Sequence, residues 1–256
     1  MRTLKLTLAY DGTRFVGWQR QAEGESIQGL LEDALARFEG APVSVHGAGR
    51  TDAGVHALAQ VASARVTCAH DTAALARGLN AQLPDDIRVI DLVEAAPDFH
   101  ARFRARSKTY RYGLRTTAVS DPFDRAYVWH VGDCLDVDAM RLAAAALIGT
   151  HDFAAFQSSG TETTSTVRTI FRSELIEAGS ALPRAPDGSA PLAIYEVEGD
   201  GFLRHMVRAI VGTLVEIGRG RRQVTAMADL VGGGTRAEAG ATAPAHGLFL
   251  VRVDYD

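Results

Sequence analysis

The chain has 256 residues, of which 46% are hydrophobic and 23% are charged, so it can bury a substantial core and is not disordered throughout. No stretch approaches the roughly 18 apolar residues of a membrane span, and the alternating N-terminus does not read as a signal peptide. We therefore expect a cytoplasmic protein without membrane contact. The net charge of −4 argues against a protein that coats nucleic acid without specificity.

Hydrophobic periodicity predicts the elements of the first part of the chain. Leu4, Leu6, Leu8 and Tyr10 alternate with polar residues, which predicts a strand. Ser26 is a suitable N-cap for a helix whose apolar positions recur at helical spacing through residue 38. After a glycine-rich loop, the pattern predicts a strand over 55–66, a short helix capped by Asp71 and ending at Leu79, and strands over 87–93 and 107–116.

From about residue 121 the pattern of helices and strands starts again. We expect a helix over 138–148, a hairpin of strands over 167–178 and 192–199, a helix over 205–217, and a last strand near residue 250. A Pro/Gly-rich insertion at 179–191 would connect the hairpin. The predicted class is α+β, with two α/β-sandwich halves, 1–120 and 121–256, whose mainly antiparallel sheets join around a central catalytic cleft.

The cysteines and histidines offer little chemistry of their own. Cys68 and Cys134 are far apart and neither belongs to a Cys-x-x-Cys motif, which argues against a disulfide framework and a cysteine zinc site. No cluster of His, Asp and Glu has metal-ligand spacing. The remaining candidates are expected to be structural histidines: His56, His100, His151 and His205.

Positive charge is clustered in two runs of arginine-rich sequence. The first run has no acidic residue and contains Arg102, Arg104, Arg106, Lys108, Arg111 and Arg115. The second is opposed only by Glu216 and contains Arg204, His205, Arg208, Arg219, Arg221 and Arg222. A GC-rich genome would explain the arginine content but not the clustering. Because arginine suits phosphates and base edges, the runs predict a folded polyanion as the ligand.

The densest chemical signal is the glycine-rich segment 46–56. It fails the dinucleotide-binding pattern G-x-G-x-x-G because Asp52 stands at the third glycine position. It fails the P-loop pattern because Val55 and His56 replace the required Lys and Ser/Thr. The loop therefore presents an arginine, Arg50, and a carboxylate, Asp52, which elsewhere would most often form a salt bridge or an Asx turn.

The string Gly-Arg-Thr-Asp-Ala-Gly-Val-His over 49–56 resembles the signature of the tRNA pseudouridine synthase A family. Six further blocks resemble that family in the same order along the chain. They are Tyr10–Thr13 with Phe15 and Gly17–Gln19, Ser26–Gln28, Asp98–Phe103 with Lys108–Tyr112, His151–Phe153 with Phe156, Phe202–Arg208, and Ala243–Leu248.

The resemblance implies isomerisation of uridine to pseudouridine at positions 38, 39 and 40 of the tRNA anticodon stem-loop. It also implies two α+β halves with a continuous sheet, a homodimer, a tRNA cleft, and neither metal nor organic cofactor. It assigns Asp52 as the catalytic carboxylate. Arg50 would fill the place that the flipped base vacates, and Tyr110 would provide an aromatic face for the uracil. Arg208 would be the charge partner of Asp52, and Leu248 an apolar wall of the pocket.

The reaction explains why a lone carboxylate would suffice. It breaks a C–N glycosidic bond and forms a C–C bond to the same ribose carbon, so nothing is oxidised or added. Asp52 could attack C1′ or remove the C2′ proton, and both routes stay open. Two other functions compete. A glycoside or nucleoside hydrolase would usually need a second carboxylate, for which Asp11 is the nearest candidate, and a non-catalytic RNA-binding or RNA-chaperone protein would not need Asp52.

Overall fold

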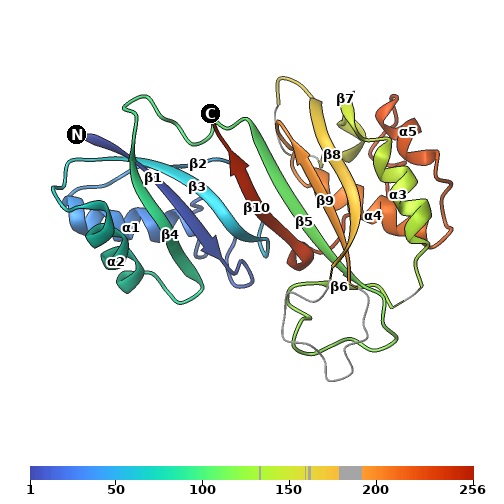
Figure 1. Ribbon diagram of the computed structural model, residues 1–256, viewed down its shortest axis with the longest axis horizontal. Coiled ribbons are helices and arrows are strands. Elements are labelled where there is room, and N and C mark those ends of the chain that lie inside the picture. Colours follow the sequence, from blue (N-terminus) through green and yellow to red (C-terminus); the bar gives the residue numbers. More distant parts are fainter. Residues whose placement is uncertain (133, 159, 161–162, 179–191) are drawn as a thin grey trace. The chain divides into compact units, whose positions relative to one another are not determined.

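A computed structural model of the protein describes residues 1–132, 134–158, 160, 163–178 and 192–256 (Figure 1). The chain forms two compact units: Met1–Arg106 with Phe249–Asp256, and Ser107–Leu248. These units do not coincide with the expected halves 1–120 and 121–256. The strand that begins at Ser107 pairs within the second unit, and the C-terminal strand returns to pair with the first.

The first unit contains a mainly antiparallel sheet. Its strands follow the order β4 (Ile87–Ala95), β1 (Arg2–Tyr10), β3 (His56–Val66) and β10 (Leu248–Asp254), and the short β2 (Val45–Gly47) pairs with β3. Only the β3–β10 pair is parallel. The predicted alternation in β1 is confirmed, because Leu4, Leu6 and Leu8 are fully buried whereas Lys5 and Thr7 are partly exposed.

Two helices lie on one face of this sheet, α1 (Ile27–Glu39) and α2 (Thr72–Gln82) (Figure 1). Both predicted N-caps are confirmed, since Ser26 Oγ accepts from the Gly29 amide (3.2 Å) and the Asp71 carboxylate from the Ala74 amide (2.7 Å). Of the apolar positions at helical spacing in α1, Ile27, Leu31 and Leu35 are buried, whereas Leu30 and Phe38 are partly exposed. α2 buries Leu75 and Leu79.

The long strands of the second unit also pair in antiparallel fashion. β5 (Ser107–Arg115) pairs with β9 (Leu192–Gly199), β9 with β8 (Val167–Ala178), and β8 with β7 (Gly149–Asp152). A short strand, β6 (Trp129–His130), pairs in parallel with β5. The predicted pairing of 167–178 with 192–199 is confirmed, while the predicted insertion at 179–191 lies outside the described residues.

Three helices complete the second unit: α3 (Val137–Ala145), α4 (Met206–Gly218) and α5 (Ala226–Val231), with 3₁₀ turns η1 (Ala154–Phe156) and η2 (Ala245–Gly247). α3 packs against both β8 and α4. It starts one residue before the predicted helix, with Asp136 as its N-cap, and ends three residues before it. The predicted α+β class with mainly antiparallel sheets is confirmed. Of the helices in the described ranges, none is long and apolar enough to span a bilayer.

Candidate active site

The loop between β2 and β3 carries Arg50 and Asp52, and strand residues hold it at several points. The Ala48 amide donates to the Val61 carbonyl (2.7 Å), and Gln60 Nε2 donates to the Gly49 carbonyl (2.8 Å). A turn closes the loop where the Val55 amide donates to the Asp52 carbonyl (3.1 Å). The backbone of this loop is therefore fixed by main-chain and side-chain bonds.

Burial alternates through the tripeptide at the centre of this loop. Thr51 is 6% exposed, whereas Arg50 is exposed and Asp52 is partly exposed. The Thr51 hydroxyl bonds to the Tyr10 hydroxyl (2.8 Å), and burial raises the pKa of Tyr10 to about 12. Tyr10 therefore stays protonated at neutral pH, and its hydroxyl can keep its hydrogen bond to Thr51. Thr51 is therefore the buried residue of the three, and both of its charged neighbours are more exposed than it is.

The chain after β1 packs directly on this loop, which explains why the two sequence motifs occur together. The Trp18 amide donates to the Thr51 carbonyl (3.0 Å). Gly17 adopts a left-handed φ of 109°, and a Cβ there would lie 2.7 Å from the Thr51 carbonyl oxygen. Only glycine allows this approach. Tyr10, Trp18 and Gln60 were not predicted as supports of the loop, because nothing in one sequence pairs them with Thr51.

A double-mutant cycle tests this support. Thr51→Val and Tyr10→Phe each remove the hydrogen bond between the two hydroxyls. Each should lower the unfolding free energy by about 1–2 kcal/mol, because the remaining buried hydroxyl loses its partner. The double variant should cost less than the sum of the two single variants, since the bond is already absent in each. Urea unfolding of the four proteins measures this, and strictly additive costs would contradict the bond.

His56 and Asp11 support the other end of the loop. His56 is 1% exposed, its Nδ1 accepts from the Gly12 amide (3.0 Å), and its ring stacks on Phe249 (4.6 Å between centroids). The structural reading of His56 is thus confirmed. Asp11 Oδ1 lies 3.2 Å from His56 Nδ1 and accepts from the Thr13 amide (2.9 Å). Asp11, the second carboxylate a hydrolase would need, is thus engaged in holding its own turn.

In the second unit, Arg208 lies on α4 beside the segment that leads into β10. Its Nε donates to the Ala243 carbonyl (2.8 Å), and the Ala243 amide donates back to the Arg208 carbonyl (3.0 Å). The Tyr112 hydroxyl donates to the next carbonyl, that of Pro244 (2.8 Å). Burial raises the pKa of Tyr112, and the nearby positive charge of Arg208 opposes that rise. Arg208 is therefore held at a defined place on α4.

Tyr110 and Leu248 are both largely covered within the second unit. Tyr110 lies on β5, is 7% exposed, and meets Phe202 edge to face at 5.0 Å between centroids. Leu248 is 5% exposed and begins β10 directly after the turn η2. Of the five predicted site residues, Arg50 and Asp52 share one loop of the first unit, and the other three belong to the second unit.

The arginine runs are more strongly paired than their sequence suggested. Arg115 is 8% exposed and forms a buried ion pair with Asp124, so its predicted phosphate contact is wrong. Elsewhere in the first run, acids from outside the run pair with the arginines: Arg104 with Asp98, Arg106 with Asp256, and Arg111 with Glu196. In the second run, Arg222 pairs with Glu216. Within the described ranges, no group of three or more His, Cys, Asp or Glu side chains is placed to hold a metal ion.

Comparison with known proteins shows one consistent similarity. The model of the family described as tRNA pseudouridine synthase matches residues 7–104 and 143–256. A protein of Solidesulfovibrio magneticus named tRNA pseudouridine synthase A is 48% identical, covering all of this chain and 92% of that protein. Proteins of the same name from Myxococcus xanthus and Syntrophotalea carbinolica are 47% and 44% identical, again covering all of this chain, and 92% and 97% of theirs.

Proposed function

Because the chain belongs to the tRNA pseudouridine synthase A family, whose members isomerise uridine to pseudouridine in tRNA, we propose that it acts at positions 38, 39 and 40 of the anticodon stem-loop with Asp52 as its catalytic carboxylate. The observation that carries the proposal is the anchored loop in which Thr51 is buried, Arg50 is exposed and Asp52 is partly exposed. Both possible reactions, attack at the ribose C1′ and removal of the C2′ proton, require a carboxylate that is held in place, and a fixed backbone provides this.

The reaction requires one ionised carboxylate and a uracil that has left the base stack of the RNA. The N1–C1′ bond of uridine breaks, the uracil turns, and C5 bonds to C1′ while the C5 proton is lost and N1 gains one. Asp52 serves either as nucleophile at C1′ or as base toward the C2′ proton. Because the target uridine lies within folded RNA, it must leave its stack before the reaction, at a cost of a few kcal/mol.

The other assigned residues follow from the same requirement. Arg50, exposed beside Asp52, occupies the space that the extruded base leaves, where a flat cation can stack on the neighbouring bases. Tyr110 is the proposed aromatic contact of the uracil, and Leu248 the proposed apolar wall of its pocket. Arg208 is the proposed charge partner of Asp52.

Substitution of Arg208 tests that charge role. Arg208→Lys keeps the charge but loses the planar bond to Ala243, whereas Arg208→Met loses both. We expect kcat to fall more in the methionine variant, by about 100-fold, as expected for a lost charge interaction of a few kcal/mol. Equal kcat values in the lysine and methionine variants would remove Arg208 from this role.

Binding of tRNA should depend strongly on salt. Although several arginines are paired, exposed cations such as Arg50, Arg102 and Arg221 remain to contact phosphates. Each phosphate contact releases a counterion, so log K should fall linearly with log salt with a slope of about −0.9 for each contact. Filter binding at several salt concentrations measures the slope, and a flat dependence would reject binding led by phosphates.

The same resemblance implies a homodimer and a cytoplasmic location, and we include both in the proposal. Light scattering coupled to size exclusion tests the dimer directly. The reaction itself is tested by incubating unmodified tRNA with the protein and digesting it to nucleosides. We expect pseudouridine at the expense of uridine and no free uracil, which a hydrolase would release. Replacing the uridines at 38–40 by cytidine should abolish the product; product formed from that tRNA would overturn the proposed positions.

A further inference from the structure

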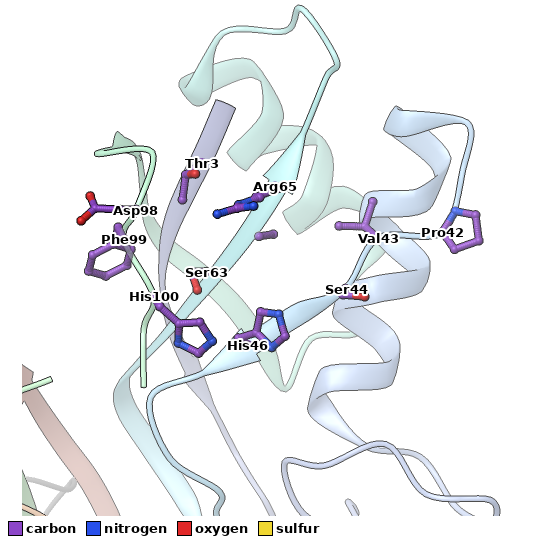
Figure 2. A pocket seen from close by; sticks show the side chains of 11 residues that line it. Thr3, Pro42, Val43, Ser44, His46, Ser63, Arg65, Asp98, Phe99 and His100 are labelled. Atoms are coloured by element: carbon purple, nitrogen blue, oxygen red, sulfur yellow. The ribbon is translucent and has the colours of Figure 1, made fainter. Parts of the chain in front are cut away.

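The first unit contains a groove that plays no part in the site above. Figure 2 shows its lining, which includes Thr3, His46, Ser63, Arg65, Phe99 and His100, and we call it the histidine groove. Its volume of about 420 Å³ lies within the range of roughly 300–1,000 Å³ that is usual for sites that bind small organic groups. The groove is large enough for one nucleotide.

Strand register places polar and cationic residues along the floor of the groove. Thr3 of β1 lies opposite Arg65 of β3, and Lys5 lies opposite Ser63. Because successive side chains of a strand alternate between faces, these residues lie on the opposite face from Leu4. His46 of β2 faces the same groove, and Figure 2 shows its ring turned toward His100 on the opposite wall.

The wall that carries His100 is held in place by bonds to the sheet and to the C-terminus. The Ala101 amide donates to Ser63 Oγ (3.1 Å), and the Ala101 carbonyl accepts from the Tyr255 hydroxyl (2.7 Å). Thr3 Oγ1 donates to the Pro97 carbonyl (3.2 Å). The groove is therefore formed before any ligand arrives, so that binding would not have to order its wall.

Planar side chains form a continuous series at the mouth of the groove. His46 stacks on His100 at 4.8 Å between centroids, and His100 contacts the ring of Phe103 at 4.4 Å. The Arg102 guanidinium lies 5.7 Å from the centre of Phe103. Phe103 is 75% exposed, so its ring is accessible to a ligand at the mouth of the groove.

The charges around the groove favour an anion. Arg65 and Arg102 are exposed cations, and Lys5 Nζ lies 4.6 Å from the centre of the Tyr255 ring, beneath the same wall. The carboxylate of the groove, Asp98, is paired with Arg104. His100 Nδ1 accepts from the Arg102 amide (3.2 Å), which leaves Nε2 as the donor of a neutral ring.

We propose that the histidine groove is a second contact site for the RNA substrate, which takes one unpaired nucleotide with its phosphate on Arg65 and its base stacked on Phe103. Aromatic and guanidinium planes are the surfaces on which unpaired bases stack, and arginine matches the geometry of phosphate. An acidic peptide would use the cations but would leave the exposed aromatic ring unexplained. The inference rests on the proposed function, because it takes tRNA to be the ligand.

Three substitutions separate the two contacts. Phe103→Leu keeps an apolar side chain but removes the aromatic face, and Phe103→Tyr restores that face. Arg65→Gln removes one cation; its matched control is Arg77→Gln, an exposed arginine on α2. Filter binding of unmodified tRNA at several salt concentrations gives Kd and its salt slope, the rate of pseudouridine formation is measured in parallel, and thermal melting confirms folding.

We expect Phe103→Leu to raise Kd about tenfold, as expected for the loss of one stacked base, and Phe103→Tyr to bind as the wild type does. Arg65→Gln should make the salt slope shallower by about 1, whereas Arg77→Gln should not change it. Values of Kd and slope equal to the wild type in both Phe103→Leu and Arg65→Gln would overturn the proposal. An effect of Arg65→Gln alone would overturn the base contact. Failure of the wild type to form pseudouridine would instead count against the proposed function.

Discussion

Asp52→Asn is expected to abolish isomerisation while tRNA affinity stays close to that of the wild type. The amide has nearly the shape of the carboxylate, so the turn in which the Asp52 carbonyl accepts from Val55 should persist. It is neutral, however, and can neither attack C1′ nor accept the C2′ proton at a useful rate. We expect kcat to fall by a factor of about 10³ or more, equivalent to about 4 kcal/mol of transition-state stabilisation.

Asp11→Asn is the matched control for this experiment. It makes the same chemical change in the same unit, at the other carboxylate that a hydrolytic mechanism would recruit. Asp11 Oδ1 accepts from the Thr13 amide, a bond that an asparagine carbonyl can also accept, so the turn should survive. Single-turnover rates and Kd for both variants decide the matter. Turnover that survives in Asp52→Asn and is lost in Asp11→Asn would reverse the assignment.

Gly212→Ala should destabilise the second unit strongly, although alanine is the better helix former. A Cβ at Gly212 in α4 would lie 1.7 Å from the Ala241 carbonyl oxygen, a backbone atom that cannot move without shifting the segment that Arg208 holds through Ala243. Helix propensity alone would favour alanine by about 1 kcal/mol. Overpacking against the backbone should outweigh it and lower the unfolding free energy by about 3 kcal/mol.

The control for this prediction is Gly78→Ala in α2. Its added Cβ would lie 2.6 Å from the far edge of the Phe38 ring, a side chain that is only half-buried and can turn aside. The unfolding free energy should therefore change by less than about 1 kcal/mol, with helix propensity offsetting the contact. Urea unfolding measures both variants. A Gly212→Ala protein as stable as the wild type would show that α4 and the 241–247 segment do not pack as closely as described.

Local signals in the sequence were enough to predict much of the fold. The alternation of Leu4, Leu6 and Leu8 predicted β1, and the caps at Ser26 and Asp71 predicted where α1 and α2 begin, because both depend on neighbouring residues alone. α3 begins earlier than predicted because Asp136 and Asp138 are equally good caps by sequence, and only the fold selects Asp136. α5 is a six-residue helix, too short for a periodic pattern to reveal.

The details that depend on remote residues could not be predicted in the same way. The arginines of 102–115 looked free because the acids that pair with them lie outside that run, as Asp124 does for Arg115 and the more distant Glu196 for Arg111. Likewise His205 was placed inside the last long helix. It instead stands before α4 with a left-handed φ of 62°, where its Nδ1 bonds to Ser158 Oγ (2.9 Å).

In the candidate site, too, the local features could be predicted from the sequence and those that depend on remote residues could not. The glycine-rich string indicated Arg50 and Asp52 because their chemistry lies in one short segment. The supports of that segment, Tyr10, Trp18 and Gln60, come from other parts of the chain, and no local pattern pairs them with the loop that they bond to. A sequence pattern can therefore indicate a candidate carboxylate, but not what keeps it in place.

The role of Asp52 and the modified positions are tested together by mapping the pseudouridines that the protein makes in unmodified tRNA, with carbodiimide treatment and primer extension. We expect stops that map to positions 38, 39 or 40 after incubation with the wild type, and none after incubation with Asp52→Asn. Stops that appear equally with both proteins, or only outside the anticodon arm, would contradict this expectation.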